Sequence, residues 1–180
     1  MEAIKKDNSY LADKVFLRVN NLPKDNDVMV LDCYGGKGVV WNHVASKTKK
    51  NIRRLAIDTR KDNIGFYLPG DNLGYLETLD IHRFNVIDLD AWGIPRKQIK
   101  TLFDREYHGT VFVTFIQSLF GAMPREMLND IGIPNEMIEK CPTLFYRSGW
   151  EYFLDWLGLY GVSVIRHRSK NRKHYLCFTL

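Results

Sequence analysis

A glycine-rich turn between an apolar strand and a helix is the feature that most constrains how this chain can fold. The apolar run 28–31 leads into Asp32, and three glycines follow it closely. They are Gly35, Gly36 and Gly38. Glycines let the backbone turn sharply and approach a ligand where a Cβ atom would collide. A helix is then expected to begin near Val39, so the segment predicts a strand–turn–helix unit that faces a nucleotide-like ligand.

A second apolar strand, expected over 52–57, ends in an acidic residue. This residue, Asp58, lies about twenty positions after the last glycine, where a carboxylate can accept hydrogen bonds from both hydroxyls of a ribose. Trp41 occupies the position at which the dinucleotide fingerprint requires a third glycine or alanine under a pyrophosphate. Because S-adenosylmethionine (SAM) carries no phosphate, it fits this turn better than NAD. The alternative is a turn that only joins a strand to a helix.

The rest of the chain alternates between strand-like and helix-like segments. Further strands are expected over 64–68, 84–89, 109–116, 162–166 and 174–179, and helices over 10–19, 73–79, 96–106, 124–131, 134–139 and 143–160. Few residues separate Asp58 from the next apolar run, so the helix between those strands is expected to be vestigial or absent. We therefore expect an α/β fold with a seven-stranded, mostly parallel sheet, flanking helices and an antiparallel C-terminal hairpin joined by 167–173. Its ligand is expected at the carboxyl ends of the first four strands.

Composition favours one intracellular domain. With 180 residues and 45% hydrophobic content, the chain suffices for a single core over 1–180. Neither a signal peptide nor a run of roughly twenty apolar residues is present, so we expect a soluble cytoplasmic protein without membrane contact. The three cysteines, Cys33, Cys141 and Cys177, are widely spaced and are expected to be reduced core thiols. The histidines show no metal-ligand spacing, so no metal is expected.

Four motifs carry a resemblance to a known family. VLDCYGGKG, LAIDTR, GDNLGYL and NVIDLD occur in this order, and with the alternation of elements they resemble the class I SAM-dependent methyltransferases over nearly the whole chain. The resemblance implies a Rossmann-like fold and SAM as the cofactor. It also implies that the first motif holds the methionine end of SAM, the second the ribose and the third the adenine. The cofactor-binding residues carried over by position are Asp32, Tyr34, Gly35, Gly36, Gly38, Asp58, Asp71, Asn72 and Asp88. Asp71 could equally be the N-cap of the following helix.

The segment after the fourth strand narrows the resemblance. FNVIDLDAWGIP is similar to the DxDPFGSP signature of the tRNA guanine-N2 dimethyltransferases, with Trp92 in place of phenylalanine. The residues that match are Asp88, Asp90, Gly93 and Pro95, whereas Ala91 and Ile94 replace the proline and the serine. The resemblance implies that the acceptor is an exocyclic amine.

Asp90 and Trp92 are therefore the predicted catalytic residues. Asp90 would orient the amine and accept its hydrogen bond or a proton, and Trp92 would form one wall of the site, against which a flipped base can stack. Methyl transfer depends mainly on aligning donor and acceptor, so it requires no catalytic triad. The alternatives are that Asp88 is a strand-end acid bonded to a neighbouring loop and that Trp92 is a core residue.

The charge distribution suggests a polyanionic partner. The chain carries a net charge of +5, with basic clusters at 47–54 and 166–173. Basic patches attract nucleic acid in a salt-sensitive way. The first cluster is expected to be solvated, whereas the second is the better candidate for contact with nucleic acid, through Arg166, Arg168, Lys170, Arg172 and Lys173. A basic edge that prevents aggregation is the alternative.

These observations predict a SAM-dependent methyltransferase that acts on an exocyclic amine of a nucleic-acid base. RNA is favoured over DNA because of the resemblance to enzymes of tRNA modification. One alternative is a methyltransferase of a small molecule or protein, with an acceptor pocket formed by Trp92, Phe115 and Phe120. A second is a SAM- or adenosine-binding subunit without catalysis. The sequence leaves the oligomeric state open.

Overall fold

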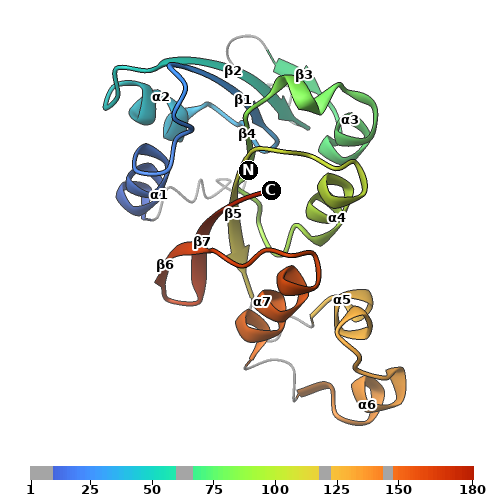
Figure 1. The fold of residues 1–180 in the computed structure, drawn as a ribbon. Helices are drawn as coiled ribbons and strands as arrows, with labels where there is room; N and C mark the ends of the chain where they lie inside the picture. The colour runs from blue at the N-terminus through green and yellow to red at the C-terminus, as the bar shows by residue number, and fades with distance from the viewer. Residues whose placement is uncertain (1–9, 60–66, 118–122, 144–147) are drawn as a thin grey trace, which may run out of the picture.

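One seven-stranded sheet organises the part of the chain that the computed structural model describes, residues 10–59, 67–117, 123–143 and 148–180. The strand order is β3-β2-β1-β4-β5-β7-β6 (Figure 1). The strands are β1 (Asp27–Asp32), β2 (Asn51–Asp58), β3 (Tyr67–Pro69), β4 (Val86–Leu89), β5 (Thr110–Ile116), β6 (Arg166–Lys170) and β7 (Lys173–Thr179). Strands β1 to β5 pair in parallel, and β7 pairs antiparallel with both β5 and β6. The mostly parallel sheet with an antiparallel C-terminal hairpin is confirmed.

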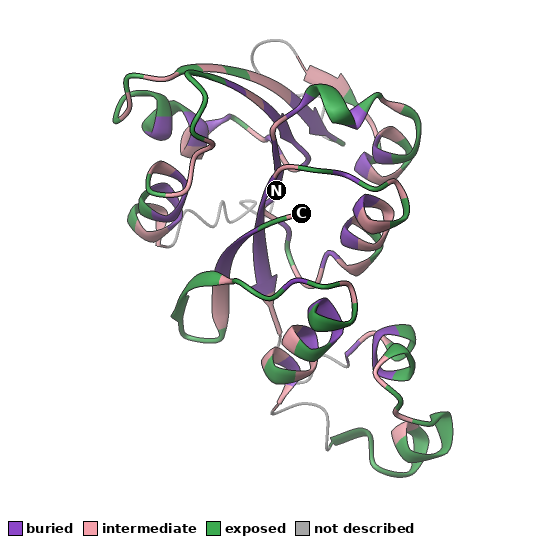
Figure 2. Cartoon of the chain, in the orientation of Figure 1, coloured by how far each residue is buried: buried purple, intermediate pink, exposed green. Residues whose placement is uncertain are grey.

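Helices cover both faces of this sheet (Figure 1). They are α1 (Leu11–Val19), α2 (Val39–Ala45), α3 (Asn72–Thr78), the 3-10 turn η1 (Ile81–Arg83), α4 (Arg96–Asp104), α5 (Arg125–Asp130), α6 (Asn135–Lys140) and α7 (Gly149–Leu159). Successive strand residues point to opposite faces. Val30 accordingly packs with residues of α1 and α2, whereas its neighbour Leu31 packs with residues of α3, α4 and α7. Burial on both faces explains why the parallel strands are nearly continuous apolar runs (Figure 2).

The expected helix start at Val39 is confirmed. Residues 60–66 lie outside the described residues, and with them the expected vestigial helix and the first part of the expected strand 64–68. The expected helix 143–160 is observed as α7 from Gly149, and residues 144–147 are also outside the described part. In the described ranges no helix has the length and apolar character needed to span a bilayer.

The expected first strand of the C-terminal hairpin is wrong, whereas the second, expected over 174–179, is observed as β7. The run 162–166 had indicated the first strand, yet β6 begins at Arg166, the last residue of that run, and its other residues had been assigned to the loop. The turn is only Asn171 and Arg172, whose φ values are 48° and 64°. Positive φ at both central residues is the geometry of a two-residue hairpin turn, for which asparagine is a preferred residue. Turn chemistry therefore sets the hairpin register, and the edge strand β6, exposed at every residue, requires no apolar run.

The cysteine prediction is partly wrong. Cys33 and Cys177 are buried free thiols as expected, but Cys141 is exposed. It follows directly after α6, a helix without a buried residue. Ile138 of this helix packs against the core, but the core does not cover Cys141.

Candidate active site at the carboxyl edge of the sheet

The sheet brings the predicted acids of the first, second and fourth strands to one edge. Asp32 ends β1, Asp58 ends β2, and Asp90 follows directly after β4. Asp32 lies opposite Asp88 in the β1–β4 pairing, so the two side chains project to the same face. This face is covered by α1 and α2. The site is therefore assembled from parallel strands that all end at one edge.

The glycine turn packs tightly against β2. A Cβ atom at Gly35 would lie 2.5 Å from the Cβ of Ala56, and Gly36 and Gly38 adopt positive φ values of 45° and 69°. The amide of Gly36 donates a hydrogen bond of 2.8 Å to Oδ2 of Asp58. Glycine is thus required here by close approach and by backbone conformation. The turn also fixes the carboxylate that was assigned to the ribose.

Asn72 connects three elements at the same edge. Its Nδ2 donates to the carbonyl oxygen of Cys33 at 2.8 Å, and its Oδ1 accepts from Nε2 of Gln98 at 2.9 Å. Burial raises the pKa of the neighbouring Tyr34. Asp71 is exposed in the N-cap position of α3, but its side chain makes no capping hydrogen bond. The Asn72 amide therefore holds the turn in place, whereas the Asp71 carboxylate projects outward.

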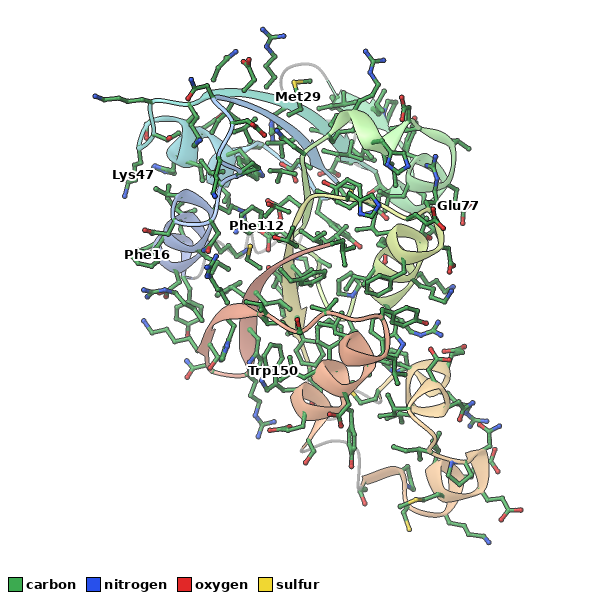
Figure 3. The ribbon with its side chains drawn as sticks, viewed as in Figure 1. Phe16, Met29, Lys47, Glu77, Phe112 and Trp150 are labelled. Carbon is green, nitrogen blue, oxygen red and sulfur yellow. The ribbon has the colours of Figure 1, made fainter. Side chains whose placement is uncertain are left out.

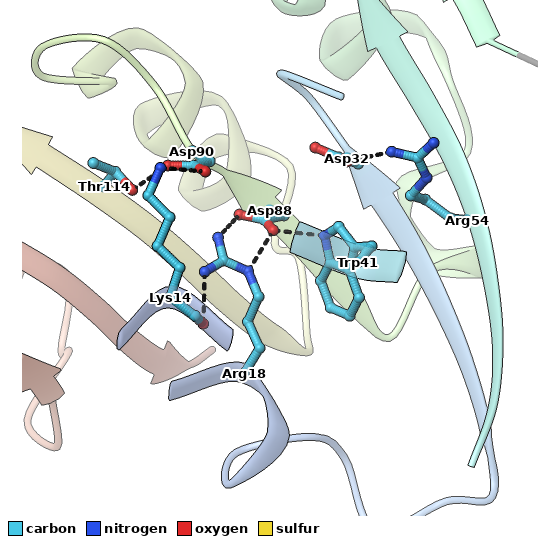
Figure 4. A network of polar contacts seen from close by, with 8 residues as sticks. All are labelled: Lys14, Arg18, Asp32, Trp41, Arg54, Asp88, Asp90 and Thr114. Atoms are coloured by element: carbon cyan, nitrogen blue, oxygen red, sulfur yellow. Dashed lines mark hydrogen bonds and ion pairs between the residues drawn. The ribbon is translucent and has the colours of Figure 1, made fainter. Parts of the chain in front are cut away.

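Asp32 is paired with a residue that the sequence analysis assigned to solvent. Nη1 of Arg54 lies 2.9 Å from Oδ2 of Asp32 (Figure 4). Burial and the nearby Asp88 raise the pKa of Asp32 to about 7, although Arg54 opposes this shift. Arg54 also lies under the turn, because a Cβ at Gly38 would be 2.5 Å from its guanidinium. The prediction that the whole basic cluster 47–54 is solvated is therefore wrong for Arg54.

Asp88 forms a buried ion pair with α1. Its carboxylate accepts hydrogen bonds from Nε and Nη2 of Arg18 at 2.8 and 2.6 Å, and from Nε1 of Trp41 at 2.7 Å. The side chains of Arg18 and Asp88 are 2% and 1% exposed. Burial alone would lower the pKa of Arg18, but Asp88, Asp90 and Asp32 together raise it, so Arg18 stays charged. The partners of Asp88 are thus helices α1 and α2, rather than a neighbouring loop.

Asp90 is also held by α1. Nζ of Lys14 lies 2.8 Å from its Oδ2, and the hydroxyl of Thr114 donates to its Oδ1 (Figure 4). Burial raises the pKa of Asp90, but the charges of Arg18 and Lys14 and the two hydrogen bonds outweigh burial, and the pKa is lowered. Asp90 is therefore a carboxylate at neutral pH and is suited to accept a hydrogen bond rather than a proton.

The two buried cations of α1, Lys14 and Arg18, were not among the residues predicted from the sequence. Lys14 and Arg18 are four residues apart and are buried together with Val15 and Leu17 of the same helix. Residues at this spacing lie on the same helix face. Two basic residues on the inward face of an amphipathic helix indicate buried acidic partners, and this signal could have identified them.

Trp92 is 71% exposed, so the alternative of a core residue is wrong. Nζ of Lys173, the first residue of β7, lies 5.6 Å from the centre of its ring system. Phe115, by contrast, is buried and stacks on Phe153, which removes it from the acceptor pocket considered above. Phe120 lies outside the described residues. Trp92 thus presents an open aromatic surface two residues from Asp90.

Solved structures of other proteins share this architecture. A candidate SAM-dependent methyltransferase from Methanococcus maripaludis is 14% identical, with a TM-score of 0.53 over 96% of this chain and 88% of that one. The fold is that of the class I methyltransferases. A candidate rRNA methylase from Clostridium thermocellum is 13% identical, with a TM-score of 0.53 over 94% of each chain. The plantazolicin methyltransferase BamL, solved with a triazolic desmethylPZN analogue and SAH, is 11% identical, with a TM-score of 0.50 over 94% of this chain and 84% of that one.

No protein-family model and no curated protein sequence matches the chain. At identities this low, the structural similarity establishes the class I methyltransferase fold alone. The chemistry depends on the residues of the site itself. Within this fold, the described residues contain no group of three or more histidine, cysteine, aspartate or glutamate side chains that could hold a metal ion.

Proposed function

We propose that this chain transfers the methyl group of SAM to an exocyclic amine of a nucleic-acid base, with RNA as the substrate and guanine N2 as the first target to test. The observation that carries the proposal is that Asp90 and Trp92 lie two residues apart in the segment that follows β4. Asp90 supplies an ionised carboxylate whose side chain is 16% exposed. Trp92 supplies an aromatic ring, and the residue is 71% exposed. An amine on a planar ring needs this combination of acceptor and stacking surface.

The edge of the sheet fits the parts of SAM. The glycine turn has no room for a Cβ atom at Gly35, and it holds the carboxylate of Asp58 beside it. This combination matches an adenosine-containing ligand. Bound SAM would supply an activated methyl group on a positively charged sulfur. Asp58 would accept the ribose hydroxyls, Asp32 would face the methionine end together with the turn, and Asp71 would face the adenine. Asn72 and Asp88 would act by holding this geometry, because their polar atoms already bond to protein partners.

Asp90 would orient the acceptor. A carboxylate with a lowered pKa accepts a hydrogen bond from the amine and directs the nitrogen lone pair toward the methyl group. It does not need to remove the proton before transfer. Lys14 and Thr114 fix the carboxylate of Asp90. The ring of Trp92 would stack on the base and hold its exocyclic amine near that carboxylate. The chain's contribution to rate is thus alignment.

The direct test is transfer of labelled methyl from SAM into tRNA, ribosomal RNA and DNA, supplied separately, with the labelled nucleoside identified after digestion. Label in one methylated base of RNA supports the proposal, and N2-methylguanosine identifies the target. Asp90→Asn should lower the rate of transfer without changing SAM binding, whereas Asp58→Ala should mainly weaken SAM binding. Asp155→Asn, at an exposed position on α7, is the matched control and should change neither.

A binding subunit without catalysis is the second candidate. Both oxygens of Asp90 already accept hydrogen bonds from protein groups. This arrangement is also compatible with a SAM-binding site that has no acceptor substrate. Measured SAM binding without label in any nucleic acid, small molecule or protein supplied would favour this candidate. Label in a small molecule or protein alone would move the acceptor outside nucleic acid and leave the SAM site as proposed.

A further inference from the structure

Aromatic rings and cations alternate across the surface where α1 meets the C-terminal hairpin. The guanidinium of Arg168 lies 3.8 Å from the centre of the Phe16 ring. Nζ of Lys170 lies 5.4 Å from the centre of the Tyr10 ring. We call the set formed by Phe16, Arg168, Tyr10, Lys170, Lys173 and Trp92 the cation–aromatic track. These residues come from α1 and its N-cap, the hairpin and the segment after β4.

The track leads to the candidate active site. Nζ of Lys173 lies 5.9 Å from the centre of the Tyr10 ring and 5.6 Å from that of Trp92, so one lysine links α1 to the ring beside Asp90. The side chain of Asn171 donates to the hydroxyl of Tyr10 at 2.6 Å and fixes the turn against α1. Figure 1 shows α1 and the hairpin on the same side of the molecule. The track therefore connects an open surface to the predicted acceptor site.

The track is exposed at four of its six residues, whereas Tyr10 and Lys173 are half-buried. Phe16, labelled on α1 in Figure 3, is 49% exposed, and every residue of β6 is exposed (Figure 2). The carboxylate of Asp13 lies 3.1 Å from Arg168 and 3.8 Å from Lys170. The hairpin carries five cations in all, namely Arg166, Arg168, Lys170, Arg172 and Lys173. Asp13 carries one negative charge against the two cations that it contacts, and Phe16 and Trp92 are 49% and 71% exposed.

We propose that the cation–aromatic track binds single-stranded RNA and delivers the target base to Trp92. Its cations would contact phosphates, and the rings of Phe16 and Tyr10 would stack on bases that flank the target. A duplex keeps its bases stacked inside, so it would use the cations alone. An acidic peptide would likewise have no use for the rings. The choice of RNA rests on the proposed function, whereas the surface itself rests on the contacts above.

Binding without SAM tests the track independently of catalysis. Fluorescence anisotropy with a labelled single-stranded RNA 12-mer gives the affinity and its salt dependence, with an RNA duplex and polyglutamate as competitors. The double variant Lys170→Gln/Lys173→Gln should reduce the slope of log K against log salt by about 1.4, because each phosphate contact on a single strand contributes about 0.7. Phe16→Ala should weaken binding by about five- to a hundredfold and leave the slope unchanged.

Matched controls separate the track from charge in general. Lys47→Gln/Lys49→Gln removes two exposed lysines between α2 and β2, and Leu159→Ala removes an exposed apolar side chain on α7. Both should bind RNA as the unmodified chain does, and all variants should show unchanged unfolding midpoints. An equal loss in the lysine control, no loss in Phe16→Ala, or equal competition by polyglutamate would each overturn the track.

The two proposals fail separately. If the track variants behave as expected but no RNA is methylated, the track stands and the proposed function is wrong. If RNA is methylated while the Phe16 and lysine variants bind it as tightly as the unmodified chain, the proposed function stands and the track is wrong.

Discussion

Replacing Arg18 by methionine should destabilise the protein strongly, because it leaves a buried carboxylate without its cation. Arg18 makes two hydrogen bonds to Asp88, and both side chains are almost fully buried. Removing one partner of such a pair costs about 3–5 kcal/mol. For a protein of this length, each kcal/mol lowers the Tm by about 2–4 °C, so the expected decrease is about 6–20 °C.

A double-mutant cycle isolates the pair. Asp88→Leu alone should also be costly, because it leaves Arg18 buried and unpaired. The double variant Arg18→Met/Asp88→Leu buries neither charge, and its main remaining loss is the acceptor of Trp41, worth about 1–3 kcal/mol. Urea unfolding followed by circular dichroism should therefore give a double-variant loss well below the sum of the single losses.

A surface pair provides the control. Arg125 and Glu139 form an ion pair whose side chains are 53% and 59% exposed. Arg125→Met should change the free energy of unfolding by about 0–1 kcal/mol. The reasoning is refuted if Arg18→Met costs no more than Arg125→Met, or if the two single losses simply add.

Three further predictions follow from local geometry. Asp32 has its pKa raised to about 7 from about 3.9 in the unfolded chain, so its contribution to stability is fully present below pH 4 and is lost as the pH rises through 7. Urea unfolding between pH 4 and 8 should show this loss, about 4 kcal/mol at 1.36 kcal/mol per pKa unit, and Asp32→Asn should lack it. Gly35→Ala places a Cβ 2.5 Å from that of Ala56 and should cost about 1–3 kcal/mol and weaken SAM binding measured by calorimetry. Cys141 should react with a thiol reagent in the native protein, whereas the two buried thiols react only after unfolding, and equal rates for all three would contradict the observed burial.

The sheet and the glycine turn were predictable because their signals are local. An apolar strand has to be covered on both faces, and a turn with positive φ requires glycine at Gly36 and Gly38, so the residues themselves restrict the backbone. The acid at the end of β2 follows from spacing along one strand. These features identified the edge at which the candidate site lies.

The hairpin shows where periodicity was insufficient. An exposed edge strand gains little from apolar side chains, so β6 had no apolar pattern to detect. Its register came instead from the conformation of Asn171 and Arg172. The conformation of these two residues therefore determined the register of β6 against β7.

The partners of the site acids were decided only by tertiary structure. Sequence showed that Asp32, Asp88 and Asp90 end neighbouring strands, but not that Arg54, Arg18 and Lys14 would approach them from β2 and α1. Partner choice for a buried charge depends on which cation the fold brings within hydrogen-bonding distance, and separation along the chain carries no information about this. The sequence thus determined the fold and which acids reach the sheet edge. The packing of α1 brought Arg18 and Lys14 to Asp88 and Asp90, and the pairing of β1 with β2 brought Arg54 to Asp32.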